Sequence, residues 1–95
     1  MAKVEVAVAA VEDLSGLVRT HSLPPDTSAR IRRSLELLER FPRLGEELGG
    51  RWAGTRFLLG PWRWMIILYS FLEEEDGVVV VTIQDGRSAA SPTAG

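Results

Sequence analysis

The chain has 95 residues, no cysteine and a net charge of −2, and 45% of its residues are hydrophobic. This length predicts one domain with a single modest core. The lack of cysteine excludes disulfides and thiolate metal sites, and the slightly acidic balance excludes a broad basic surface for nucleic acid. The longest apolar run, residues 64–72 with one serine inside it, is far shorter than the roughly 20 residues that span a bilayer. With an N-terminus unlike a secretory signal, we expect a cytoplasmic protein without membrane contact.

The first half of the chain predicts a strand and two helices. Valine alternates with Glu5 and small residues over residues 4–10, which is typical of a strand, and from Val11 the apolar residues recur at helical spacing. Pro24 and Pro25 then interrupt the pattern. A second helix is predicted over about residues 27–41, because an apolar stripe runs along it until Pro42.

The second half predicts three strands, over residues 52–59, 62–72 and 78–83. The last two are joined by an acidic turn, residues 73–77, and therefore form a hairpin. The resulting order is β-α-α-β-β-β. We predict an α+β fold in which a helical hairpin packs on one face of a mainly antiparallel sheet.

Alternation within the predicted strand over residues 62–72 suggests which of its faces is exposed. Arg63 alternates with Met65, Ile67 and Tyr69, and an unpaired arginine is seldom buried. We therefore expect the Trp62 side of this strand to meet the helices and the other side to be exposed. An exposed face this apolar predicts a covering partner, a second copy of the chain, or cover from the C-terminal tail.

Three arginines are candidates for an anion site. The hairpin places Arg63 and Arg87 at the end opposite the turn, and Arg56 on the preceding strand is a candidate to join them. Guanidinium groups bind phosphate or carboxylate through two parallel hydrogen bonds. The alternative is that these arginines only pair with a local carboxylate such as Asp85. His21, the one histidine, lies far along the chain from the arginines and is expected to be a solvated turn residue.

The order and spacing of several short motifs resemble the RelE/ParE superfamily of toxins from bacterial type II toxin–antitoxin modules, the plasmid-stabilisation type. The resemblance covers residues 3–88. We therefore expect a single domain over residues 1–88, followed by a disordered tail over residues 89–95. The motifs are L-P-P-D between the helices, L-L-E-R-F-P-x-L-G ending at Gly45, Gly54-Thr55-Arg56, Trp62-Arg63, and Asp85-Gly86-Arg87.

The resemblance implies a growth-inhibiting toxin that is neutralised by a cognate antitoxin, in a homodimer or a heterotetramer with the antitoxin. Antitoxin binding is expected at the face of Met65, Ile67 and Tyr69. No metal or cofactor motif is present in the sequence, and none is expected.

Two toxic activities and a third, non-toxic role follow from the resemblance. A RelE-like ribonuclease cuts mRNA in the ribosomal A site, and its catalytic residues would be Arg56, Arg63 and Arg87. A ParE-like toxin instead poisons DNA gyrase and needs no acid or base. After Arg87 the chain has no tyrosine, histidine or lysine, which favours the ParE-like activity over the RelE-like one. A non-toxic binding module on the same fold is the third alternative.

Overall fold

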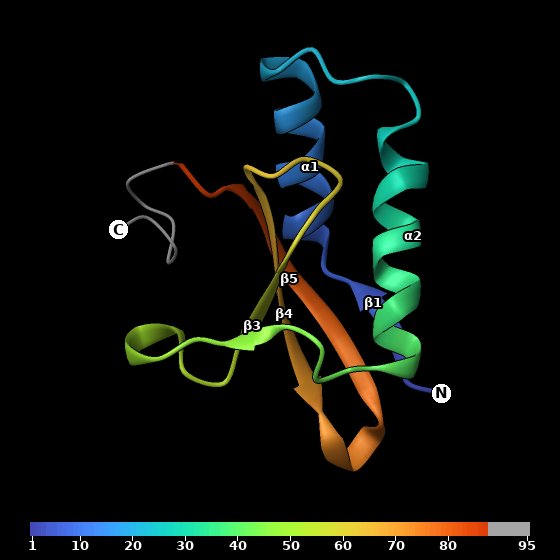
Figure 1. Ribbon diagram of the computed structural model, residues 1–95, viewed down its shortest axis with the longest axis vertical. Helices are drawn as coiled ribbons and strands as arrows, with labels where there is room; N and C mark the ends of the chain where they lie inside the picture. The colour runs from blue at the N-terminus through green and yellow to red at the C-terminus, as the bar shows by residue number, and fades with distance from the viewer. Residues whose placement is uncertain (88–95) are drawn as a thin grey trace.

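The computed structural model describes residues 1–87, so the predicted tail, residues 89–95, lies outside the described part of the chain. Two helices lie beside a sheet, and the longest hairpin extends past their lower ends (Figure 1). The elements are β1 (Lys3–Val6), α1 (Val8–Thr20), α2 (Thr27–Arg40), β2 (Glu46–Glu47), the 3-10 helix η1 (Gly50–Trp52), β3 (Arg56–Leu59), β4 (Met65–Leu72), the 3-10 helix η2 (Glu73–Glu75) and β5 (Gly77–Asp85).

Within residues 1–87 the sheet has five strands, in the order β1-β5-β4-β3-β2. β1 is parallel to β5, and the other neighbours are antiparallel. The α+β prediction is therefore confirmed, with one short strand added. β2 was not predicted because two consecutive glutamates carry no apolar alternation.

The first strand is shorter than predicted and the first helix begins earlier. The amide of Ala7 still donates to the carbonyl of Val80 across the sheet (2.9 Å), whereas the amide of Val11 donates back to the carbonyl of Ala7 (3.1 Å). The change from strand to helix thus occurs at Ala7. α2 agrees closely with its prediction, and the buried Thr27 at its start donates its hydroxyl to the carbonyl of Pro24 (2.6 Å).

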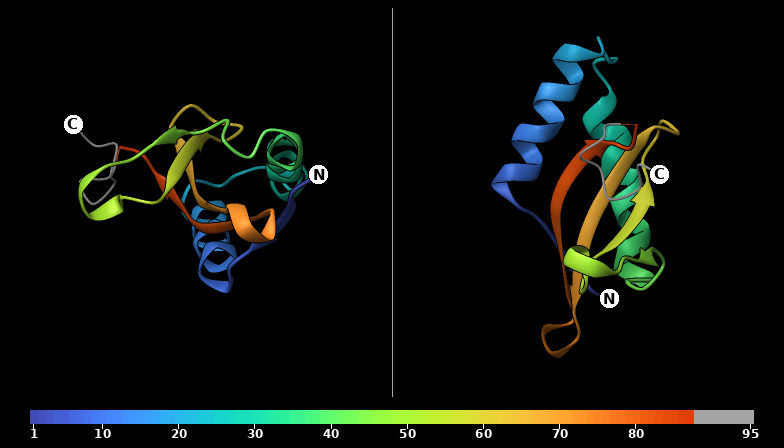
Figure 2. Two further views of the ribbon diagram at one scale, coloured as in Figure 1. Left: turned by 90° about the horizontal axis from the view of Figure 1, so that it is seen from below. Right: turned by 90° about the vertical axis from the view of Figure 1, so that its left-hand side faces the viewer.

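Both helices pack on the same side of the sheet (Figure 2). α2 contributes the largest apolar stripe, and α1 adds Ala10 together with partly buried leucines. No helix among residues 1–87 is long and apolar enough to cross a bilayer. The main core side chains of α2, β4 and β5 are Ile31, Leu35, Leu38, Met65, Ile67, Tyr69, Val78, Val80 and Ile83.

The predicted assignment of the two faces of β4 is wrong. Met65, Ile67 and Tyr69 are 0% exposed and belong to the core that the helices cover. The error arose at Arg63, which precedes the strand: the amide of Met65 donates to the carbonyl of Trp62 (3.0 Å), closing a turn. This turn interrupts the alternation of side chains between the two faces of the sheet. The exposure of Arg63 therefore does not indicate on which face Met65 lies.

The hydroxyl of Tyr69 also has a structural role. It accepts a hydrogen bond from the amide of Gly45 (2.8 Å), and burial raises the pKa of this tyrosine. A Cβ atom at Gly45 would lie 2.5 Å from the carbonyl oxygen of Phe57 and 2.8 Å from the tyrosine ring. The glycine at the end of the L-L-E-R-F-P-x-L-G motif therefore allows this close approach.

Candidate functional site

The β4–β5 hairpin brings together the two chain segments that carry Arg63 and Arg87. Met65 pairs with Asp85 at the last position of the ladder, and the amide of Gly86 donates to the carbonyl of Trp64 (2.6 Å). The residues just before β4 and just after β5 are consequently neighbours, as expected from the predicted hairpin. The catalytic roles of these arginines remain predictions.

The side chain of Arg87 is held by Asp85. Its Nε donates to Oδ1 (3.0 Å) and its Nη2 to Oδ2 (2.9 Å), while the backbone amide of Arg87 also donates to Oδ1 (2.9 Å). The Arg87 guanidinium lies 5.1 Å from the ring centroid of Trp64. These bonds hold the pKa of Asp85 well below its usual range. The local ion pair that the sequence left as an alternative is therefore present.

His21 belongs to this cluster, so the expectation that it is a solvated turn residue is wrong. It is the first residue after α1, and its ring stacks on Trp64 with 4.4 Å between centroids and 17° between planes. Its Nε2 lies 3.3 Å from Asp85 Oδ2, and its Nδ1 is buried with no partner among the described residues. The side chain is only 25% exposed.

The sequence signal for this contact was weak. His21 and Asp85 are separated by 64 positions, and no motif links the end of the first helix to the end of the last strand. The nearest clue was Trp64, since a tryptophan beside a strand end attracts a planar or cationic neighbour.

Trp62 continues the cluster toward α2. Its ring lies 6.4 Å from that of Trp64, and the Arg30 guanidinium lies 5.6 Å from the Trp62 ring centroid. Both tryptophans are partly buried and pack against the core. Arg63, between them in sequence, is exposed.

Arg56 is not part of this cluster. It pairs with Tyr69 in the middle of β4, and its Nη1 donates to the carbonyl of Gly45 (2.8 Å). Its Nη2 contacts Glu47 Oε1 at 3.2 Å. Arg56 thus stabilises the connection between β2 and β3, and the sequence-based expectation that it joins the other two arginines is wrong.

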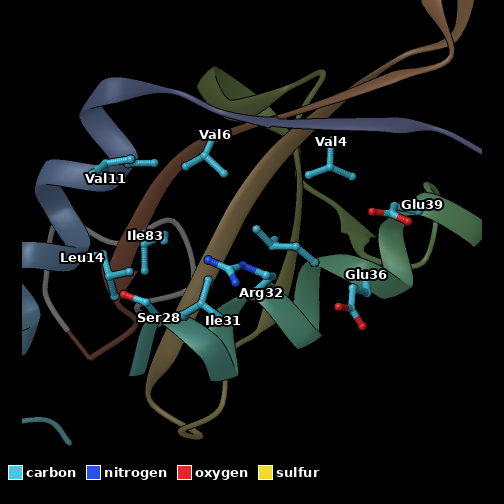
Figure 3. Close-up of a pocket in the computed structure, with 12 residues that line it drawn as sticks. Val4, Val6, Val11, Leu14, Ser28, Ile31, Arg32, Glu36, Glu39 and Ile83 are labelled. Carbon is cyan, nitrogen blue, oxygen red and sulfur yellow. The ribbon is translucent and has the colours of Figure 1, made fainter. Parts of the chain in front are cut away.

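A second feature, which the sequence did not predict, is a mainly apolar groove between α1, α2 and β1. Its volume is about 440 Å³. Figure 3 shows Val4 and Val6 of β1 facing Ile31 of α2, with Val11 and Leu14 of α1 at one end. Val6 is 40% exposed and Val11 55%. The charged side chains in the lining come from α2 and are Arg32, Glu36 and Glu39.

Comparisons with known proteins identify the fold. No protein-family model matches the chain, and no curated protein matches it. Among solved structures, the chain is similar to the RelBE2 toxin–antitoxin complex of Mycobacterium tuberculosis, with 27% identity and a TM-score of 0.66 over 88% of this chain and 96% of that one. It is also similar to the isolated RelE toxin of E. coli, with 11% identity and a TM-score of 0.64 over 90% and 84%.

A third similar structure is that of a conserved hypothetical protein, HP0892, from Helicobacter pylori, with 15% identity and a TM-score of 0.60 over 90% of this chain and 94% of that one. The match with the RelE toxin and the RelBE2 complex extends over nearly the whole domain. The chain therefore has the fold of the RelE/ParE superfamily of toxins, as the order of its sequence motifs predicted.

Proposed function

We propose that this chain is the toxin of a type II toxin–antitoxin module, neutralised in the cytoplasm by a cognate antitoxin. The observation that carries the proposal is the similarity to the RelBE2 complex, which covers 88% of this chain and 96% of the matched chain at 27% identity. A match over the full domain leaves little of either chain outside the shared fold. Fold alone does not determine activity, so the activity is argued from the site.

We further propose that the toxin acts as a RelE-like ribosome-dependent ribonuclease. Cleavage of a phosphodiester needs cationic groups for the developing charge and a side chain that can carry a proton. Arg63 and Arg87 lie in adjacent segments, and His21 lies beside Asp85 and Trp64 in the same cluster. The sequence-based preference for a ParE-like gyrase poison depended on the lack of a tyrosine, histidine or lysine after Arg87 and on the low basicity of the chain. His21 supplies an imidazole beside the carboxylate that Arg87 binds, from another part of the chain, and so answers the first of these two reasons.

The activity is tested by inducing the chain in cells that lack its genomic neighbour, with the Arg63→Ala and Arg87→Ala variants alongside. We expect wild-type growth arrest with mRNA cuts that depend on translating ribosomes. Each arginine variant is expected to lower cleavage by about 100-fold or more, the scale of lost transition-state stabilisation by one donor. Arg56→Ala, which alters the β2–β3 connection, serves as the matched arginine control when its unfolding midpoint is unchanged.

Other outcomes identify the alternatives. DNA breaks with intact mRNA would replace the ribonuclease with a ParE-like gyrase poison. Normal growth without the neighbour would instead support a non-toxic binding module. Co-expression of the neighbouring gene product should restore growth in either toxic case, and failure to do so would contradict the proposed antitoxin pairing.

We propose the groove between α1, α2 and β1 as the surface that the antitoxin covers. It replaces the face of Met65, Ile67 and Tyr69, whose side chains are buried in the core and cannot reach a partner. The groove has a mainly apolar lining, and β1 beside it is the last strand of the sheet, with a backbone edge that no other strand among residues 1–87 pairs with. An extended or helical apolar segment fits such a surface.

A further inference from the structure

The carboxylate of Asp85 is surrounded by hydrogen-bond donors that would suit an external anion equally well. Arg87 contributes its backbone amide, Nε and Nη2, all between 2.9 and 3.0 Å from the carboxylate oxygens. His21 Nε2 adds a contact of 3.3 Å to Oδ2. A guanidinium fork binds phosphate with the same two parallel hydrogen bonds that it gives to a carboxylate.

The donors are held in place by contacts other than those to Asp85. Trp64 stacks on the His21 ring and also lies 5.1 Å from the Arg87 guanidinium. The backbone of Trp64 is itself fixed by its hydrogen bond from Gly86. Trp64 therefore contacts both His21 and Arg87 independently of the carboxylate.

The site is also accessible from solvent. The side chain of Arg87 is 63% exposed, whereas those of Asp85 and His21 are 21% and 25% exposed. Since Asp85 is anchored in the ladder by its pairing with Met65, only its side chain would have to rotate to vacate the donors. An incoming anion can thus reach Arg87 first and His21 behind it.

We propose that Arg87, His21 and Trp64 form a binding site for a phosphate group of single-stranded RNA, and that Asp85 occupies this site as a built-in competitor. The proposal rests on the proposed ribonuclease function and assigns roles in RNA binding to His21, Trp64 and Asp85. His21 is a phosphate-binding donor here, and Asp85 lowers the affinity of the free toxin for RNA. The only change on binding is the exchange of one anion for another on the same donors.

The test is binding of a short single-stranded 2′-O-methyl oligoribonucleotide, which cannot be cut at its 2′-hydroxyl, to the full chain by fluorescence anisotropy. Asp85→Asn is expected to bind about tenfold more tightly than wild type, corresponding to the loss of one charge-assisted competitor. Asp26→Asn is the matched control, since Asp26 forms a similar pair with Arg30 (2.9 Å) at the other end of the tryptophan cluster. It removes the same charge and should change affinity by less than about twofold.

Two further variants test the donors. His21→Phe retains a ring for stacking on Trp64 but removes the donor, so in the Asp85→Asn background it should remove most of the gain. Arg87→Gln should abolish the gain completely. Unfolding midpoints of all variants show whether the fold is intact. In the same Asp85→Asn background, His21→Gln keeps an N–H donor and should therefore bind the oligoribonucleotide more tightly than His21→Phe.

Several results would overturn the proposal. Equal or weaker binding by Asp85→Asn would show that Asp85 positions Arg87 instead of competing with RNA. Binding of inorganic phosphate without binding of the oligoribonucleotide would exclude RNA as the ligand, and no binding by any variant would exclude the site altogether. Because this assay uses no ribosome and no cells, its failure is distinct from a lack of toxicity, which would contradict the proposed function alone.

Discussion

Asp85 is the carboxylate that both Arg87 and His21 contact in this site. Three hydrogen bonds from Arg87 and one contact from His21 favour its ionised form. As a result, the folded protein holds the pKa of Asp85 well below the value of about 3.9 expected in the unfolded chain. The difference links the stability of the fold to pH through one identifiable group.

A depressed pKa of a carboxyl group in the folded state stabilises the protein above the unfolded pKa and loses this effect as the pH falls. We therefore expect wild type to exceed Asp85→Asn in free energy of unfolding at pH 7, with the difference shrinking below about pH 4. Urea unfolding between pH 7 and pH 2.5 measures it. In an Arg87→Gln background the difference should be nearly independent of pH, and parallel curves for wild type and Asp85→Asn would contradict the assignment.

His21 shows why part of the site could not be predicted from the sequence. Arg63 and Arg87 were found because strand pairing at a hairpin is local and fixes both ends at once. His21 meets Asp85 only after α1 has packed along β5, a contact between distant parts of the chain. No periodicity in the sequence encodes such a contact, so a histidine near a proline turn was interpreted as solvated.

At the scale of elements, the spacing of apolar residues predicted which segments form helices and strands. It did not predict which face of β4 packs against the helices. The helix of α2, the β4–β5 hairpin and their order all follow from apolar spacing. The faces of β4 could not be decided in this way, because Ile66 and Leu68 are also buried, at 2% and 0% exposure. A strand buried on both faces has no polar alternation to reveal its orientation.

The corrected faces change the expected effect of Ile67→Asp. Had this side chain been exposed, the substitution would have weakened partner binding and left the fold intact. Because Ile67 is 0% exposed among apolar neighbours, an aspartate there buries an unpaired carboxylate, which costs several kcal/mol. Since small domains are stable by only about 5–15 kcal/mol, we expect the variant to be largely unfolded at 37 °C by circular dichroism.

Leu59→Asp is the matched control, since Leu59 lies on the neighbouring strand at 54% exposure and pairs with Ile66. It should lower the free energy of unfolding by no more than about 1 kcal/mol. Comparable stability of the two variants would mean that Ile67 is not in the core, and the face assignment would have to be reversed again.

At the scale of the whole molecule, the groove and the arginine-containing site are separate features that meet at β5. Ile83 lines the groove, and Asp85 lies two residues further along the same strand. A partner segment in the groove would therefore contact the same strand that carries Asp85. This arrangement allows an antitoxin to bind mainly through apolar contacts and still approach the site that the toxin would use on RNA.

The groove prediction is tested by placing a charge at its α1 wall. Val11→Asp puts a carboxylate into the apolar lining, where a bound antitoxin would have to desolvate it, so the dissociation constant should rise by about 30-fold or more. Val8→Asp is the matched control, because Val8 is 74% exposed on the same helix and does not line the groove. Both side chains are largely outside the core, so both variants should keep the wild-type unfolding midpoint. Titration calorimetry with the cognate antitoxin measures the two affinities, and an equal effect of the two variants would place the antitoxin elsewhere on the toxin.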